Sequence, residues 1–303
     1  MEKLLIGLVA FVLLQNCSTD QTDQPQELDR LEKEIQKVIK DKDATVGVAV
    51  WGISSSDTLS INGDLHLPMQ SVYKFHIATA VLHEVDSGKL SLDDTIMITK
   101  ALVDTPLWSV IKKDYPEGGE ITLREVIRYT VTNSDNIGCD ILLDLIGGPK
   151  VVEDYIHANG ITEIAIKHNE QTMQSDWSLQ YLNWTTANTA NKALKTFFEN
   201  QANQLSEESH AFLWEVMRQA FFSEISLKTY LPEDTVIAHK TGSSGKDKDG
   251  ITGAQNDIGI IFLPNGDYYY LSVLVSRSAE SSEVNKKIIA DIAKLTYDYF
   301  TTH

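Results

Sequence analysis

A serine and a lysine stand three positions apart in the segment Ser71-Val72-Tyr73-Lys74. On a helix this spacing places the two side chains on one face, about one turn apart. The amine could then take the proton of the hydroxyl, which is a poor nucleophile until a base activates it. The tetrapeptide by itself also fits an ordinary helix start, because this pattern occurs by chance in many helices.

Two triplets downstream favour the chemical interpretation. Ser134-Asp135-Asn136 lies where a short loop meets a predicted helix. Lys240-Thr241-Gly242 lies at the end of a predicted strand and is followed by Ser243. Each triplet is weak alone, but the ordered set of all three motifs is rarely met by chance and is typical of enzymes that acylate a serine.

Helices and strands must bring these motifs together. Strands are predicted near both ends of the chain, over 45–51, 58–61, 235–240, 257–263 and 268–275. Helices are predicted over 28–39, 72–86, 122–129, 136–146, 150–158, 186–200, 207–221 and 283–300. A sheet built from both ends must close over a helical insertion. We therefore expect an α/β lobe (about 28–67 and 222–303) and an all-α lobe (about 68–221), with a ligand cleft between them.

The first residues predict export. An apolar run from Leu4 to Leu14 behind Lys3 is too short to span a bilayer and fits a secretory signal peptide. The segment ending at Cys17 resembles a bacterial lipoprotein signal, although Asn16 is larger than the residue usual before the lipidated cysteine. A plain cleaved signal is the alternative. We expect a signal over 1–17, a flexible linker over 18–27 and a periplasmic catalytic domain over 28–303, tethered to a membrane if Cys17 carries lipid.

Composition excludes other classes of function. The net charge of −17 and the absence of a basic stripe argue against a nucleic-acid partner. His76 and His83 are seven positions apart without a carboxylate at ligand spacing, so we expect no metal site. We expect His239 to be a packed strand residue rather than an acid–base group. Cys139, the only other cysteine besides Cys17, reads as a buried inert thiol.

The three motifs together resemble a class A serine β-lactamase, over about residues 28–300. The resemblance implies an antiparallel sheet flanked by helices with an inserted helical lobe and the site between the lobes. It also implies a monomer that needs no cofactor and hydrolyses penicillins and cephalosporins, conferring antibiotic resistance. The segment Tyr181–Thr185, Ala238-His239 before Lys240 and Ser243-Ser244 after Gly242 are similar to the PER-type, extended-spectrum branch.

The resemblance assigns a role to each motif residue. Ser71 is the nucleophile, and Ser134 passes a proton to the leaving nitrogen. Lys74, Glu170 through a water, or both act as the base of acylation, a point disputed for the family. Glu170 then activates the water that breaks the acyl-enzyme. The substrate is bound by residues on both sides of the cleft, namely Asn136, Lys240, Thr241, Gly242 and Ser243.

Three features leave the details of the resemblance open. Trp108 occupies the place of an aromatic side chain at the cleft mouth, and a core tryptophan is the alternative. No arginine matches the one that many family members direct at the substrate carboxylate. His168 and Asn183 stand where the family usually has an Arg–Asp pair that braces the glutamate loop, so a wider loop and bulky cephalosporin substrates are expected.

Two other functions remain possible at this stage. A penicillin-binding D,D-peptidase shares the fold and the nucleophile, but the presence of Glu170 argues against it. A non-hydrolytic β-lactam sensor or binding lipoprotein would be acylated once and would keep the adduct. Sensors of this kind normally carry transmembrane helices linked to an effector, which the sequence does not show.

Overall fold

The computed structural model describes residues 24–54, 57–220 and 226–302. The predicted signal and the predicted lipidation site Cys17 lie outside the described residues. Within the described part, no helix combines the length and the apolar content needed to cross a membrane.

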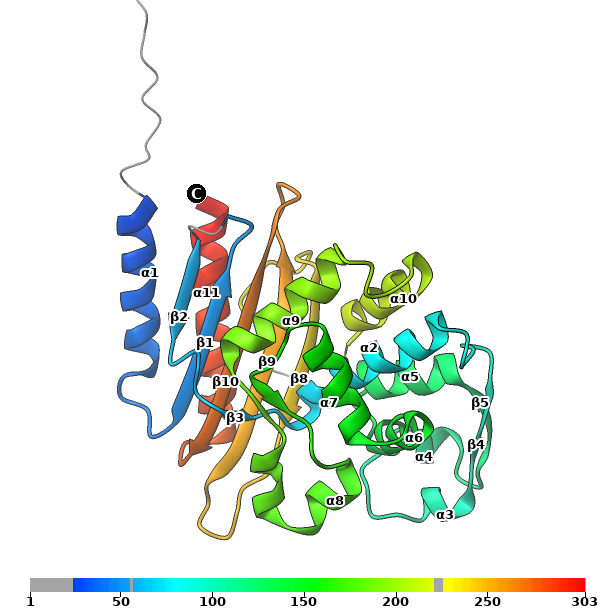
Figure 1. Cartoon of the computed structure of the whole chain (residues 1–303). Helices are drawn as coiled ribbons and strands as arrows, with labels where there is room; N and C mark the ends of the chain where they lie inside the picture. The colour runs from blue at the N-terminus through cyan, green and yellow to red at the C-terminus, as the bar shows by residue number, and fades with distance from the viewer. Residues whose placement is uncertain (1–23, 55–56, 221–225, 303) are drawn as a thin grey trace, which may run out of the picture.

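One antiparallel sheet forms the centre of the α/β lobe, with the strand order β2-β1-β10-β9-β8 (Figure 1). Its alternating apolar residues supply both faces of the sheet with buried side chains, as expected for a sheet covered on both sides. The strands are β1 (Thr45–Trp51), β2 (Thr58–Ile61), β8 (Ile237–Ser243), β9 (Thr252–Phe262) and β10 (Tyr268–Ser278). β8 is one of the two edge strands, and it extends three residues past Lys240. The Lys-Thr-Gly triplet therefore lies within a strand rather than at its end.

Two helices from opposite ends of the chain cover one face of this sheet. They are α1 (Gln24–Ile39) and α11 (Ser282–Thr302), which pack side by side (Figure 1). Their apolar stripes close the smaller of the two cores, around Ile35, Val273 and Ile292. α1 begins four residues earlier than the sequence predicted, so residues 24–27 are helical and not part of a linker.

The other face of the sheet meets the helical lobe in the larger core. The long helices are α2 (Tyr73–Asp86), α5 (Leu123–Thr132), α6 (Asn136–Ile146), α7 (Pro149–Ala158), α9 (Ala187–Glu199) and α10 (Glu207–Arg218). α9 packs directly on β1, β9 and β10, so this segment belongs to the layers of the sheet and not to the lobe predicted for it. α2 runs through the centre of the lobe, with contacts to α5, α6, α7 and α10.

Short elements connect these helices. They are β3 (Leu67–Pro68), η1 (Gln70–Val72), β4 (Thr95–Ile98), α3 (Lys100–Val103), α4 (Ile111–Asp114), β5 (Gly119–Thr122), β6 (Ile164–Ala165), α8 (Glu170–Ser175), η2 (Trp177–Leu182) and β7 (Trp184–Thr185). Most were not predicted, because two-residue strands and single helical turns carry no hydrophobic period.

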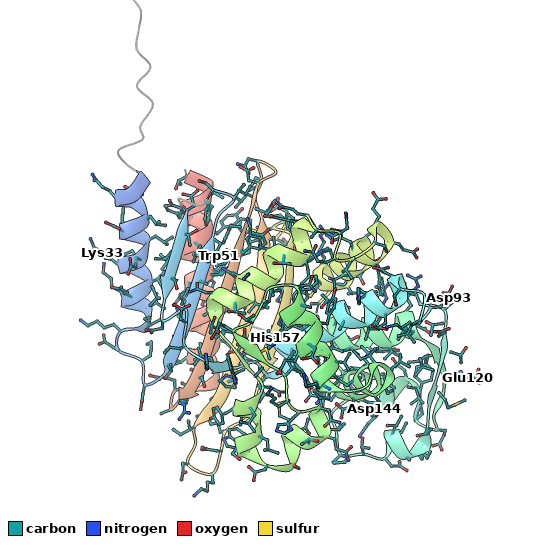
Figure 2. The ribbon with its side chains drawn as sticks, in the orientation of Figure 1. Lys33, Trp51, Asp93, Glu120, Asp144 and His157 are labelled. Carbon is teal, nitrogen blue, oxygen red and sulfur yellow. The ribbon has the colours of Figure 1, made fainter. Side chains whose placement is uncertain are left out.

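Local signals fix the helix ends that the site depends on. Thr122 and Glu125 form the predicted capping box at the start of α5. Asp135 caps α6 through the backbone N–H of Gly138, and Gly147 ends that helix in the left-handed conformation. Charged side chains such as Lys33, Asp93 and Glu120 stand out from the ribbon into solvent (Figure 2).

Candidate active site

The three motifs meet where the edge strand β8 passes the start of α2. The closest approach is at Gly242, where an added Cβ would lie 2.4 Å from the Met69 carbonyl oxygen and 3.1 Å from the Ser71 nitrogen. Any side chain at this position would push β8 away from the turn that carries Ser71. The glycine of the Lys-Thr-Gly triplet therefore sets the spacing between the nucleophile and the strand.

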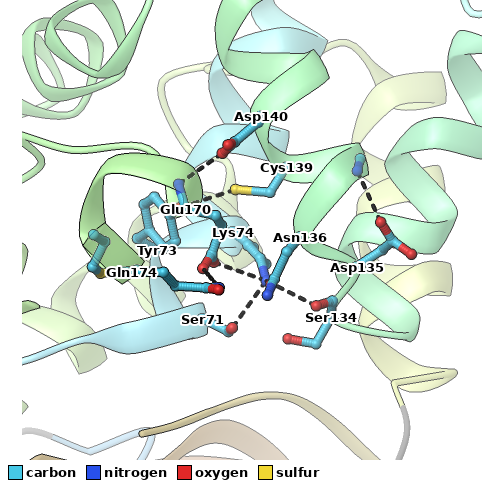
Figure 3. A network of polar contacts seen from close by, with 12 residues as sticks. Ser71, Tyr73, Lys74, Ser134, Asp135, Asn136, Cys139, Asp140, Glu170 and Gln174 are labelled. Carbon is cyan, nitrogen blue, oxygen red and sulfur yellow. Dashed lines mark hydrogen bonds and ion pairs between the residues drawn. The ribbon is translucent and has the colours of Figure 1, made fainter. Parts of the chain in front are cut away.

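Lys74 is the centre of the polar contacts (Figure 3). Its ammonium donates to Ser71 Oγ at 2.9 Å, to the Ser134 carbonyl oxygen at 2.8 Å and to Asn136 Oδ1 at 2.6 Å. The same Nζ lies 3.0 Å from Glu170 Oε1. The Lys74 side chain is 0% exposed, so these contacts replace the water that a buried ammonium would otherwise require. The hydroxyl, the amine and the carboxylate form one connected group.

Ser134 is held in an uncommon conformation. Its φ of +59° is in the left-handed region, which costs a residue with a Cβ about 1 kcal/mol or more and persists only where the surroundings impose it. Its carbonyl faces Lys74, and its hydroxyl accepts a hydrogen bond from Lys240 Nζ at 3.0 Å. The loop between α5 and α6 thus presents Ser134 to both lysines.

The remaining motif residue, Asp135, points away from the cleft (Figure 3). It is buried, and one carboxylate oxygen accepts hydrogen bonds from the Ser109 hydroxyl at 2.7 Å, the Val110 N–H at 2.6 Å and the Ile111 N–H at 3.0 Å. Asp135 therefore fixes the segment that carries Trp108 against the start of α6. Trp108 is 55% exposed and lines the cleft, so the alternative of a core tryptophan is wrong.

Glu170 lies at the first turn of α8, a short helix where the sequence predicted a loop. Asp140 accepts the backbone N–H of Glu170 at 2.7 Å and that of Gln171 at 3.0 Å, as an anion does at a helix start. Burial raises the pKa of Asp140 to about 6, against the lowering effect of these two N–H groups. Asp140 was not predicted as a site residue, although its position four residues after Asn136 places it on the same face of α6.

Asn183 closes the loop that carries Glu170. Its amide oxygen accepts the N–H groups of Lys167 and His168 at 2.8 and 3.0 Å, and its amide nitrogen donates to the His168 carbonyl at 2.8 Å. Neutral hydrogen bonds thus join the two ends of the loop at the place where the sequence analysis noted a missing ion pair.

Lys240 lies on the side of the cleft that strand β8 forms. It is 1% exposed, and its Nζ donates to Ser134 Oγ and, at 3.1 Å, to the Thr241 carbonyl oxygen. Burial, followed by the positive charge of Lys74, lowers the pKa of Lys240 to about 7. A cavity of about 350 Å³ lies between the two walls and is lined by Ser71, Trp108, Asn133, Ser134, Asn136, Thr241, Gly242 and Ser243.

A second cavity of about 470 Å³ adjoins the first one at Ser243. It lies between the Glu170 loop and the end of β8, and is lined by Gln70, Met173, Gln174, Trp177, Gln180, Ser243, Ser244 and Gly245. Two of these lining residues bond each other, because Gln70 Nε2 donates to Gln180 Oε1 at 2.8 Å. Among the described residues that line the two cavities there is no arginine. Lys228 is directed elsewhere, because its ammonium bonds the carbonyl oxygens of Glu233 and Thr235.

The other candidate residues of the sequence analysis lie outside the cleft. His76 is buried in α2, and His239 is buried on β8, as expected for a packed strand residue. Cys139 is buried against the Tyr73 hydroxyl, and burial raises the pKa of its thiol. No group of three or more His, Cys, Asp or Glu side chains in the described part of the chain is arranged to hold a metal ion.

Comparisons with known proteins agree with this geometry. The model of the β-lactamase enzyme family matches residues 30–300. β-Lactamase VEB-1 of Pseudomonas aeruginosa is 47% identical over 296 residues, which are 98% of this chain and 96% of the relative. Extended-spectrum β-lactamase PER-1 of Pseudomonas aeruginosa is 45% identical over 271 residues, 89% and 87% of the two chains. The crystal structure of TLA-3 extended-spectrum β-lactamase superposes with a TM-score of 0.87 at 45% identity, covering 90% of this chain and 99% of that one.

These matches confirm the predicted fold and the predicted family. The expected antiparallel sheet with an inserted helical lobe is present, and the relatives extend over nearly the whole chain. The chain belongs to the β-lactamase enzyme family, as a class A serine β-lactamase of the VEB and PER type.

Proposed function

We propose that Ser71 opens the β-lactam ring as a covalent nucleophile and that Glu170 directs the hydrolysis of the resulting ester. The observation that carries this proposal is the position of the Lys74 ammonium, 2.9 Å from Ser71 Oγ and 3.0 Å from Glu170 Oε1. One buried group thus links the nucleophile to the carboxylate that would activate water. This linkage suits an enzyme that releases its product, rather than a protein that stays acylated.

Acylation forms the bond between Ser71 Oγ and the lactam carbonyl carbon and breaks the lactam C–N bond. The serine proton passes to Lys74 after the ammonium has given its own proton to Glu170, 3.0 Å away, or it passes to Glu170 through a water; both routes remain part of the proposal. The backbone N–H groups of Ser71 and Ser243 bind the oxygen as it becomes negative. Ser134 Oγ gives its proton to the leaving nitrogen and is reprotonated by Lys240, whose Nζ donates to it.

Deacylation requires a base near a water on the ester. Glu170 is held by the backbone contacts of α8 with Asp140, and its second oxygen lies 3.5 Å from the Gln174 amide. The carboxylate takes a proton from water and the water oxygen attacks the ester carbon. The C–O bond to Ser71 Oγ breaks, and the proton returns from Glu170 to Ser71 Oγ through Lys74. No cofactor takes part in this sequence.

The substrate carboxylate is bound at β8. Thr241 and Ser243 offer hydroxyl groups, Lys240 offers the positive charge below them, and Asn136 binds the amide of the substrate side chain. Gly242 keeps this strand close to Ser71. Trp108 covers the ring system from the opposite rim. Because no arginine lines the described cavities, we assign the whole electrostatic attraction for the carboxylate to Lys240.

We further propose that the substrates include cephalosporins with bulky side chains. The second cavity, of about 470 Å³, opens beside Ser243, where such a side chain would extend. The neutral closure by Asn183 and the extended-spectrum designations of PER-1 and TLA-3 support the same class of substrate. Hydrolysis of a penicillin, an early cephalosporin, an oxyimino-cephalosporin and a carbapenem measured side by side tests the assignment. Turnover limited to the penicillin would overturn it.

The decisive test of the function uses the purified chain and a chromogenic cephalosporin at neutral pH. We expect rapid turnover, and its loss in Ser71→Ala. Absence of turnover from the unmodified chain, with a stable adduct in mass spectrometry, would favour the sensor. Release of D-alanine from a D-Ala-D-Ala peptide would favour the D,D-peptidase.

We also propose that the protein acts as a monomer in the periplasm, held at a membrane by lipid on Cys17. The support is the sequence pattern around Cys17 and the helix α1, which begins seven residues after it. Mass spectrometry of the mature N-terminus checks the lipid, and Cys17→Ala should release the activity into the soluble periplasmic fraction. A mature chain without lipid would favour the alternative, a plain signal peptide that is cleaved off.

A further inference from the structure

The outer face of helix α1 carries basic side chains, although the net charge of the protein is −17. Arg30, Lys33, Lys37 and Lys40 follow one another at intervals of three or four residues, which places them along one face of the helix. Lys40 continues the last turn, because its N–H bonds the Gln36 carbonyl oxygen at 2.9 Å. All four side chains are exposed, and Lys33 extends away from the rest of the molecule (Figure 2). These four residues form the basic face of α1.

The helix separates the basic face from the acidic residues of the same segment. Along the chain the basic residues alternate with Glu27, Asp29, Glu32 and Glu34, so the sequence shows no basic run. In the helix the three glutamates are half-buried, and only Asp29 is exposed like the basic residues. The expectation that the chain has no basic stripe is therefore wrong at α1, because a helical period does not produce a run of charges in the sequence.

The positive charge of the basic face is only partly neutralised. Arg30 and Lys37 have carboxylates at 3.7 and 2.6 Å, whereas no ion pair involves Lys33 or Lys40 in the described part of the chain. A hollow of about 640 Å³ runs along this face and is lined by all four basic side chains and by Glu34. An anionic group in this hollow would therefore meet positive charge from several side chains at once.

The basic face lies at the edge of the molecule opposite the cleft. α1 packs on α11 and on β2, and β2 and β8 are the two edge strands of the sheet. β8 carries Lys240 and Thr241, whereas α1 is the outermost element on the other side (Figure 1). A surface that contacts α1 from outside thus leaves the cleft beside β8 open.

The position of Cys17 favours a lipid bilayer as that surface. Seven residue steps separate Cys17 from Gln24, the first residue of α1, and an extended chain of this length spans about 25 Å at most. Lipid on Cys17 would therefore hold α1 close to the phosphate groups of the same membrane. Basic residues beside a lipid anchor strengthen its attachment to an anionic bilayer.

We propose that the basic face of α1 binds the phosphate groups of an anionic phospholipid bilayer and directs the cleft away from the membrane, towards substrates in solution. The negative charge of the rest of the protein opposes contact through other faces. The proposal builds on the proposed lipid at Cys17, but the binding itself depends neither on that lipid nor on the hydrolysis of β-lactams.

The test is co-sedimentation of the purified Cys17→Ala protein, which carries no lipid, with phospholipid vesicles. We expect it to bind vesicles of phosphatidylglycerol and phosphatidylethanolamine but not vesicles of phosphatidylcholine alone. Salt at about 0.3 M should release it, because salt screens exposed charges. Lys33→Gln combined with Lys40→Gln should lower the partition coefficient about tenfold. Lys113→Gln combined with Lys192→Gln changes the net charge equally at two exposed positions on α4 and α9, and should change the coefficient less than about twofold. Circular dichroism checks that both variants are folded.

A fluorescent label tests the orientation. With Cys17 replaced and Cys139 buried, an introduced cysteine is labelled selectively. An environment-sensitive dye on Gln26→Cys, which lines the hollow, should shift its emission to shorter wavelength when vesicles are added. The same dye on Lys246→Cys, just beyond the end of β8, should not shift.

The possible outcomes separate the alternatives. Absence of binding to the anionic vesicles at low salt overturns the inference, as does equal binding to phosphatidylcholine or an equal loss in the two double variants. Equally strong binding of duplex DNA at the same salt would assign the basic face to nucleic acid instead. A shift of the dye at both positions would overturn the orientation. None of these measurements uses turnover of a β-lactam, so failure of the proposed function would be seen separately.

Discussion

Two buried basic residues stand two positions apart on α2 and have opposite surroundings. Lys74 faces the cleft, where its ammonium has three hydrogen-bond acceptors and a carboxylate within 3.0 Å. His76 faces the core, and neither ring nitrogen has a hydrogen-bond partner. Both side chains are 0% exposed. Two equally buried basic side chains thus differ in their hydrogen-bond acceptors, which the opposite elements supply to Lys74 and not to His76.

The largest effect is expected at His76, on the stability of the protein at low pH. Burial lowers the pKa of His76 to about 3. As the pH falls below about 6.5, the unfolded chain binds a proton that the folded chain refuses until about pH 3, so stability present above pH 6.5 is lost. The full difference is about 5 kcal/mol. His76→Leu should lose less stability between pH 7 and pH 4 in urea unfolding. His83→Leu, at an exposed position of the same helix, serves as control; an equal change in both variants would contradict the assignment.

The role of Lys74 in the cleft is tested by two substitutions of this residue. Lys74→Ala removes one of the two proposed proton acceptors and leaves Glu170 buried without its partner, so kcat/KM should fall about a thousandfold, or about 4 kcal/mol. Lys74→Arg keeps a positive charge beside Glu170 and Asn136 but cannot accept a proton. If Lys74 is the base of acylation, both variants lose the same activity in stopped-flow acylation. If Glu170 is the base, the arginine variant acylates faster than the alanine variant.

Glu170→Gln, also in the cleft, separates acylation from deacylation. The amide cannot take a proton from water, so the ester at Ser71 should persist, with kcat lower by about a hundredfold to a thousandfold. Intact-mass spectrometry during turnover checks this result. An enzyme without a detectable adduct would show that Glu170 is not needed for deacylation in particular.

Lys240 is a third buried basic residue, and it lies on the β8 side of the cleft. Because the pKa of Lys240 is lowered to about 7, the charged form is lost as the pH rises through neutrality. For an anionic substrate, kcat/KM should therefore fall above pH 7, approaching about tenfold per pH unit. A β-lactam whose carboxylate is esterified should lack this decline. A decline of equal size with the ester would assign the titration to another group.

The smallest effect is expected at the exposed rim. Trp108 is 55% exposed, so Trp108→Ala should raise KM by a few fold and leave the midpoint of unfolding nearly unchanged. Trp214 is 2% exposed, and the same truncation there should cost about 3 to 5 kcal/mol of stability. Equal stability losses in the two variants would show that Trp108 supports the fold rather than the substrate.

Much of this protein could be read from local patterns. Helix ends followed from caps and glycines, such as Thr122 with Glu125 and Gly147, because these signals act within one turn of the chain. The motif triplets and Glu170 indicated the chemistry because catalysis requires particular side chains. The fold class followed from strands at both ends and helices between them. The tertiary structure added the short elements, the place of α9 on the sheet and the extension of β8 past Lys240.

The sequence alone thus determined which residues could act and which long helices and strands lie beside them. Tertiary structure decided their partners: Asp140 beneath Glu170, Asn183 across the loop from His168, Gly242 against Ser71, and Asp257 behind Thr241. The physical reason is distance along the chain. A hydrogen bond or ion pair between residues tens of positions apart leaves no period in the sequence, and the free energy of a buried charge depends on the groups that folding brings beside it.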